Sequence, residues 1–129
     1  MNAATPSIHA LRIAVDGTIR HLALPATAAD QLTALHTAIG CHTIDVVRLT
    51  VHLDMWLVDE STLVDPPAVN KAATILVHHF GYYSRLCFGT AVLTGGTDRH
   101  GDLLPLSTNV TDHIRTLLAP YIHQPHQDA

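Results

Sequence analysis

The chain has 129 residues and a formal net charge of −4, the size expected of one domain built around one hydrophobic core. Hydrophobic residues make up 47% of the sequence and charged residues 14%, which excludes the composition of a disordered chain. The 7 Lys and Arg residues are outnumbered by 11 Asp and Glu residues, so no basic stripe is available to neutralise phosphates. We therefore expect no direct binding of DNA or RNA.

No apolar run approaches the roughly 18 residues that a membrane-spanning helix needs, and the first residues lack the pattern of a signal peptide. We therefore expect a cytoplasmic protein that does not contact a membrane. In that compartment the widely separated Cys41 and Cys87 are more typical of two buried thiols than of a disulfide.

The predicted elements begin with a β-hairpin. Strand-like runs cover residues 8–15 and 18–24, and Asp16-Gly17 between them is a strong hairpin signal. Pro25 ends the second run.

A helix follows the hairpin. Thr27 and Asp30 form an approximate capping box, apolar residues recur at helical spacing over residues 32–39, and Gly40 is well placed as the C-terminal stop. The later elements, in chain order, are a strand over 44–51, a turn at 52–54, a strand over 55–58, a helix over 68–77 after the extended turn Asp65-Pro66-Pro67, a strand pair over 86–93 broken by Gly89, and a helix from Ser107 or Thr108 to Tyr121.

This order, ββαββαββα, predicts an α+β fold with a small mixed, mostly antiparallel sheet and about three helices packed on it. One domain then spans residues 1–129. We expect its ordered part to run from about residue 7 to 121, because the tail 122–129 has no apolar period and resembles a flexible terminus.

The common catalytic and metal-binding patterns are missing from the sequence. Eleven histidines are present, but the adjacent pair His78-His79 and the distant His100 lack the spacing of zinc ligands on one helix face. Cys41 stands beside His42, yet sequence adjacency does not create an activated nucleophile. The glycines near residues 89–96 lack the lysine of a P-loop. We predict no metal site, no cofactor and no catalytic residue.

One acidic group flanks the only tryptophan, Trp56: its members are Asp54, Asp59, Glu60 and Asp65. The simpler interpretation is a polar turn after a strand, with Trp56 half buried against the sheet. The functional interpretation is an acidic, aromatic contact patch for a basic partner surface or a polar ligand, because exposed tryptophan is a favoured binding anchor.

Four segments of the chain resemble a known family: Leu53-Asp54-Met55-Trp56-Leu57-Val58-Asp59-Glu60, Pro67-Ala68-Val69-Asn70-Lys71-Ala72-Ala73, Phe88-Gly89-Thr90-Ala91-Val92-Leu93-Thr94-Gly95 and Gly101-Asp102-Leu103-Leu104-Pro105-Leu106. The family consists of small domains of unknown function from bacteria, plasmids and bacteriophages, notably actinobacterial ones, with DE, Asn-x-x-Ala and Gly-Thr-Ala-Val motifs. The resemblance covers roughly residues 20 to 118. It implies no catalytic residue, and the chain departs from the pattern at Ser61-Thr62-Leu63 and at Gly40-Cys41.

Two functions remain open from the sequence. The first, which we favour, is a non-enzymatic accessory or regulatory protein of a mobile element or actinobacterial genome that contacts an unknown protein partner, such as a host or defence factor. The second is a small-molecule or nucleotide-binding domain, with weak hydrolytic activity at most, that uses one pocket. The candidate binding residues are Trp56, Asp59, Glu60, Asn70 and Gly89. A homodimer that buries an edge strand is compatible with either function.

Overall fold

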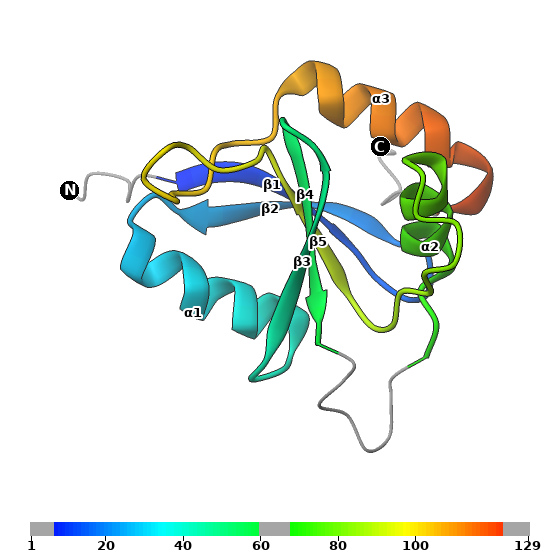
Figure 1. Cartoon of the computed structure of the whole chain (residues 1–129), viewed down its shortest axis with the longest axis horizontal. Helices are drawn as coiled ribbons and strands as arrows, with labels where there is room; N and C mark the ends of the chain where they lie inside the picture. Colours follow the sequence, from blue (N-terminus) through cyan, green and yellow to red (C-terminus); the bar gives the residue numbers. More distant parts are fainter. Residues whose placement is uncertain (1–6, 60–67, 123–129) are drawn as a thin grey trace, which may run out of the picture.

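The computed structural model describes residues 7–59 and 68–122. It confirms an α+β fold with a sheet and three helices (Figure 1). The elements in chain order are β1 (Ser7–Ile13), β2 (Ile19–Pro25), α1 (Ala28–Ile39), β3 (Ile44–Thr50), β4 (Leu53–Val58), α2 (Lys71–His79), β5 (Ala91–Thr94) and α3 (Thr108–Leu118), followed by a 3-10 turn (Ala119–Tyr121).

The five strands form one antiparallel sheet in the order β2-β1-β5-β4-β3. Two hairpins, β1–β2 and β3–β4, are each formed by neighbours in sequence, and β5 lies between them. All four residues of β5 are buried, as expected for a central strand that is covered on both faces. β5 therefore joins the two hairpins into one sheet.

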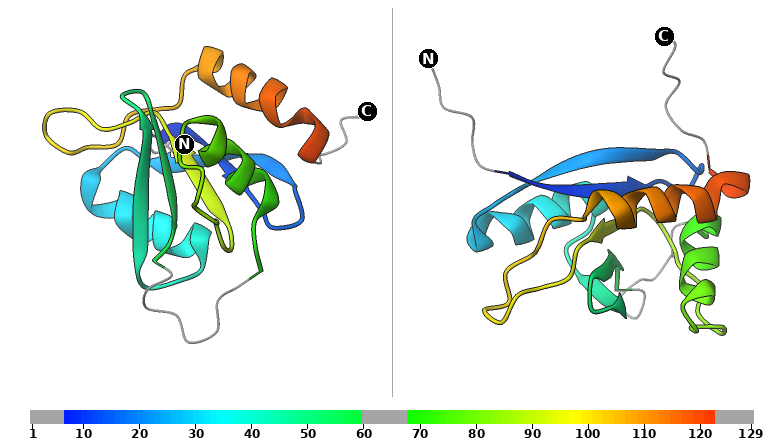
Figure 2. Two further views of the ribbon diagram at one scale, coloured as in Figure 1. Left: turned by 45° about the vertical axis from the view of Figure 1, so that its right-hand side comes forward. Right: turned by 90° about the horizontal axis from the view of Figure 1, so that it is seen from above.

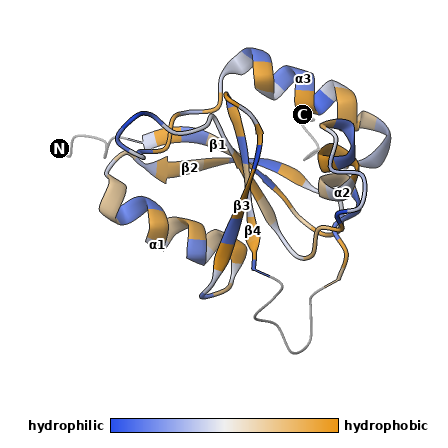
Figure 3. Cartoon of the chain, viewed as in Figure 1, coloured by the Kyte–Doolittle hydropathy of each residue, from blue (hydrophilic) through white to orange (hydrophobic). Residues whose placement is uncertain are grey.

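The sheet has a hydrophobic core on each face, because side chains alternate along every strand. In β1, Ala10 faces the core under α1, whereas Leu11 and Ile13 face the core under α2 and α3. Figure 1 shows α1 on one side of the strands and the other two helices on the opposite side. Figure 3 shows apolar and polar residues alternating along α3, the pattern of a helix with one buried face.

Most of the predicted helix and turn signals act as expected. Gly17 adopts φ 91° in the first hairpin turn, where the Asp16 carboxylate accepts the Thr18 N–H at 2.8 Å. Gly40 ends α1 in the left-handed conformation, with φ 81°. Ser107 caps α3 by accepting the N–H of Val110 at 3.1 Å.

The predicted capping box of α1 takes a different form. The Thr27 hydroxyl donates to the Asp30 carboxylate at 2.8 Å instead of accepting a backbone N–H. No described helix has the length and apolar content to cross a membrane.

The structure corrects three of the predicted boundaries. The second helix begins at Lys71 and not at 68, because the Asn70 side chain caps it. The turn between β3 and β4 occupies residues 51–52, so Leu53 and Asp54 belong to β4. Only β5 forms where we expected a strand pair, and Leu86 is 50% exposed. The turn at 65–67 and the tail from residue 123 lie outside the described residues.

Candidate functional site

Asn70, which we expected in a ligand pocket, is wholly buried and holds the start of α2. Its side-chain oxygen accepts the backbone N–H of Ala73 at 3.0 Å. Its amide nitrogen donates to the carbonyl oxygens of Ile13 at 3.0 Å and Gly89 at 2.9 Å. Both amide hydrogens therefore have acceptors within the fold. The Asn-x-x-Ala segment at residues 70–73 is thus a helix cap that also ties α2 to two other segments.

Gly89 belongs to the same junction as Asn70. It adopts φ 72°, a conformation that favours glycine, and its N–H donates to the carbonyl oxygen of Ala68 at 2.9 Å. Trp56 lies elsewhere, on the α1 side of β4, in a pocket to which neither Asn70 nor Gly89 contributes. The structure thus does not bring these three predicted binding residues together.

The acidic group around Trp56 is not a continuous surface patch. Asp54 is wholly buried, and its Oδ1 lies 3.2 Å from Nε of Arg48, so it is not accessible to a partner. Asp59 is half-buried just after β4. Glu60 and Asp65 lie outside the described residues. Within the described residues, the predicted acidic contact surface therefore reduces to Asp59.

Trp56 lines a pocket of about 120 Å³, here called the Trp56 pocket. The pocket lies between the first half of α1, β4 and the loop that follows β5. Figures 1 and 2 show that loop, in yellow, at the same end of the molecule as the start of α1. The residues that line the pocket are Ala28, Gln31, Leu32, Leu35, Trp56, Gly101 and Leu103.

Two features hold the walls of the Trp56 pocket in place. The indole N–H of Trp56 donates to Oγ1 of Thr94 at 3.0 Å, and Thr94 is wholly buried in β5. The loop over residues 97–103 is closed by Asp98, whose carboxylate accepts the N–H groups of His100 at 2.8 Å and Asp102 at 3.0 Å. The pocket is therefore largely preformed.

The wall of the pocket contains one incompletely satisfied polar group, the amide of Gln31. Gln31 is 4% exposed, and its Oε1 accepts the N–H of Leu103 at 3.3 Å. Its Nε2 is buried with no hydrogen-bond partner among the described residues. A buried donor without an acceptor costs about 1–3 kcal/mol.

Arg48 fastens the loop after β5 to the sheet. Its Nε donates to the buried carboxylate of Asp54, and its Nη2 donates to Oγ1 of Thr97 at 2.9 Å. The Arg48 side chain is 60% exposed, whereas that of Asp54 is 0% exposed, so the two partners differ in access to water. Only Arg48 can be solvated if the pair is broken.

We expect Arg48→Ala to destabilise the fold more than Asp54→Asn. Loss of Arg48 leaves a buried carboxylate without its cation, at a cost of about 2–4 kcal/mol, whereas Asp54→Asn leaves a guanidinium in water and costs about 1 kcal/mol. Urea unfolding of the two variants at neutral pH measures the difference. Equal losses would contradict the asymmetry.

The cysteines and the histidine pair singled out from the sequence do not form a reactive centre with one another. Cys87 is 1% exposed, and burial raises the pKa of the Cys41 thiol, which disfavours the nucleophilic thiolate. His78 bonds through Nε2 to the carbonyl oxygen of Arg85 at 2.8 Å, whereas His79 packs edge-on against Phe80. Over residues 7–59 and 68–122, no three His, Cys, Asp or Glu side chains gather as metal ligands would.

Trp56 is the one pocket-lining residue that we identified as a binding candidate from the sequence, and Gln31 and Leu103 are among those that we did not. Gln31 stands four residues before Leu35 on the buried face of α1. A glutamine at a core-facing helical position is the signal that could have identified it. For Leu103 the sequence contains no comparable signal, because its position depends on how the loop after β5 folds back.

One comparison with known proteins supports the expected membership in a family of domains of unknown function. The search of curated proteins and the search of solved structures found no match. A family model described as a domain of unknown function, DUF3846, matches residues 8–119, a range that runs from β1 through α3. The chain therefore belongs to the DUF3846 family.

Proposed function

We propose that this domain is a non-enzymatic accessory or regulatory module that binds a partner protein through the Trp56 pocket. The observation that supports the proposal is a preformed, mainly apolar pocket next to an exposed leucine. Leu32 of α1 is 55% exposed and stands at the pocket rim, where it can extend the contact area. Partner proteins commonly place one anchoring side chain in such a pocket.

The size of the pocket favours a side chain over a nucleotide. Small-molecule sites usually enclose about 300–1,000 Å³. The Trp56 pocket has about 120 Å³, slightly less than the roughly 150 Å³ of an engineered cavity that binds benzene. An aliphatic side chain or a small ring fills this volume, whereas a base, a sugar and a phosphate together do not.

The chemistry of the walls also favours binding over catalysis. None of the described residues that line the pocket has an ionisable or nucleophilic side chain. The indole of Trp56 and the side chains of Leu32 and Leu35 offer apolar contacts. The matching occupant is an apolar side chain of the partner.

The genomes in which the resembling domains are expected suggest what kind of protein the partner is. The resemblance implies that such domains occur in phages and plasmids, which act in a cell that another genome controls. We accordingly propose a host or defence factor of an actinobacterial cell as the partner.

The test compares two exposed apolar residues, one at the pocket and one away from it. Leu32→Glu places a charge at the pocket rim, whereas Val51→Glu changes a 74% exposed residue in the turn between β3 and β4. Each protein is expressed in the native host and purified under identical conditions. We expect a stoichiometric partner with the wild type and with Val51→Glu, and at least a tenfold loss with Leu32→Glu.

The single tryptophan provides an independent readout of where the partner binds. Because Trp56 is the only tryptophan in the chain, an anchor that enters the pocket must change its fluorescence. The purified partner is titrated onto the domain after its own tryptophans are replaced with phenylalanine. Binding that leaves Trp56 emission unchanged, or that both glutamate variants weaken equally, would refute the Trp56 pocket as the contact.

A further inference from the structure

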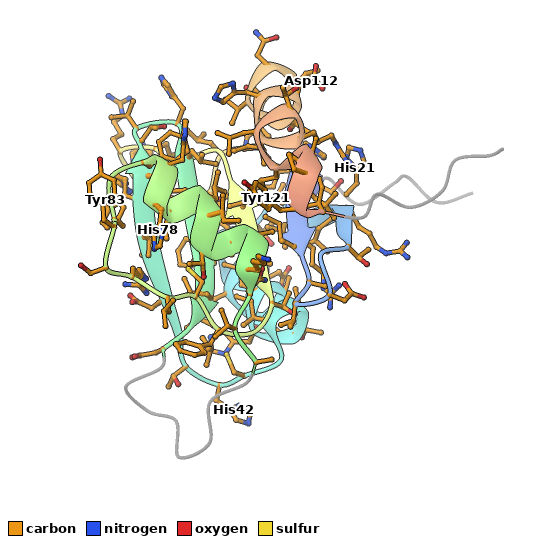
Figure 4. The ribbon with its side chains drawn as sticks, turned by 90° about the vertical axis from the view of Figure 1, so that its right-hand side faces the viewer. His21, His42, His78, Tyr83, Asp112 and Tyr121 are labelled. Carbon is orange, nitrogen blue, oxygen red and sulfur yellow. The ribbon has the colours of Figure 1, made fainter. Side chains whose placement is uncertain are left out.

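Four polar side chains form a continuous chain of contacts between the first hairpin and α3. Nε2 of His21 lies 3.3 Å from Nη2 of Arg115, and Nδ1 of His21 lies 3.2 Å from Nδ1 of His9. Nε2 of His9 lies 3.4 Å from Oγ1 of Thr111, which in turn donates to the carbonyl oxygen of Ser107 at 2.8 Å. Figure 4 shows His21 beside α3. We call His9, His21, Thr111 and Arg115 the histidine network.

The two ends of the histidine network determine the direction of every hydrogen bond in it. Arg115 can only donate, so Nε2 of His21 must accept and carries no hydrogen. The one hydroxyl hydrogen of Thr111 is already given to Ser107, so Oγ1 can only accept from Nε2–H of His9. Both ends therefore impose the same direction, from Arg115 toward Ser107.

This direction assigns the proton on each imidazole ring. A neutral imidazole has one N–H. Because Nε2 of His21 carries no hydrogen, the ring proton is on Nδ1, which donates to Nδ1 of His9. His9 accepts there and carries its own hydrogen on Nε2. Every link is then satisfied by two neutral rings, and a further proton on either ring breaks at least one link.

We propose that the histidine network is a proton-controlled contact between the β1–β2 hairpin and α3, complete only while both imidazoles are neutral. Protonation of His9 at Nδ1 places two N–H groups against each other. Protonation of His21 at Nε2 places a cation against the Arg115 guanidinium. Protonation of His21 thus breaks a link between the hairpin and α3, whereas protonation of His9 breaks the link between the two rings of the hairpin.

The groups around His9 also favour its neutral form. His21 faces it from β2 and Arg115 faces it from α3, while the exposed Asp112 of α3 makes no hydrogen bond or ion pair with either ring. Burial, then His21 and then Arg115 lower the pKa of His9 below its ordinary value of 6.5. The unfolded chain therefore binds a proton at this residue more readily than the folded chain does.

The position of Arg115 also disfavours binding of a metal ion by His9 and His21. A metal bound at both Nδ1 atoms would force the His21 proton onto Nε2, directly facing the guanidinium. The proton is thus the species to which the network responds.

The first test reads the ring protons directly. Nitrogen-15 NMR of the labelled wild-type protein at pH 7.5 should show the Nδ1–H form of His21 and the Nε2–H form of His9. On acidification the Nε2–H form of His9 should give way to a ring that is protonated on both nitrogens. A hydrogen on Nε2 of His21 at pH 7.5 would overturn the proposal, and this experiment does not depend on any variant being able to fold.

The second test measures how the folding constant depends on pH. The stability that comes from the neutral form of His9 is fully present above pH 6.5 and is lost as the pH falls through the lowered pKa of His9. The folding constant falls by up to about tenfold per pH unit in this range. The double variant His9→Gln/His21→Asn should show a shallower fall between pH 6.5 and 5. The control His52→Gln/His100→Asn removes two exposed histidines and should keep the wild-type slope. Equal slopes in the two double variants would refute the proposal.

Discussion

Asn70→Ala is expected to lower the free energy of unfolding by about 3–5 kcal/mol, a large fraction of the stability of a domain this size. The substitution removes the cap of α2 and leaves the carbonyl oxygens of Ile13 and Gly89 without their donor in the protein interior. A cap contributes about 1 kcal/mol, and each buried group left without a partner costs about 1–3 kcal/mol. Denaturant unfolding followed by circular dichroism provides the measurement.

A second N-cap in the same chain supplies the control. Ser107 accepts the N–H of Val110 at the start of α3, but it is exposed and bridges to no distant strand. Ser107→Ala should therefore cost only about 1 kcal/mol. If Asn70→Ala costs no more than Ser107→Ala, then Asn70 is only a helix cap and the junction contributes nothing further.

Gly95→Ala should destabilise the fold by about 3 kcal/mol or more, through a steric effect alone. A Cβ at this position would overlap the backbone carbonyl of Pro105, whose carbon atom would lie 2.7 Å away. The Gly95 N–H also donates to the carbonyl oxygen of Leu104 at 2.9 Å, so the two backbones cannot separate without losing that bond. Overpacking against backbone is costly because no side chain can move aside. Urea unfolding measures the loss.

Gly101 distinguishes this steric effect from the ordinary conformational cost of replacing glycine. Gly101 lies in the same loop with φ 84°, but a Cβ there would meet nothing within 4 Å. Gly101→Ala should cost about 1 kcal/mol, from backbone strain alone. If the two variants lost similar amounts of unfolding free energy, the loop would have to shift its backbone at little cost. That result would contradict a preformed wall of the Trp56 pocket.

Local signals predicted much of the fold. The Asp16-Gly17 turn, the Gly40 helix stop and the Ser107 cap each act over a few residues, and all three occur in the structure. The region after α2 was predicted less well. Leu86 and Phe88 are apolar like strand residues, but only residues 91–94 have neighbours on both sides in the sheet.

The candidate site was harder to predict because its contacts span long distances in sequence. Asn70 is predicted as a binding residue from its polar side chain, yet its role depends on a hydrogen bond to Ile13, which lies 57 positions away. Trp56 was identified, but its pocket partner Leu103 is positioned only once the loop after β5 folds back against α1. Periodicity and spacing do not contain that information.

The central place of β5 also has a consequence for the time course of folding. Each hairpin can form from its own short segment of chain, a process that takes microseconds. The two hairpins share no strand until Ala91–Thr94 inserts between β1 and β4, and that insertion closes a loop of most of the chain. Non-local closure of this kind is slow, so the arrival of β5 is the step that should limit the rate. During synthesis on the ribosome, the sheet cannot be completed until this strand has emerged.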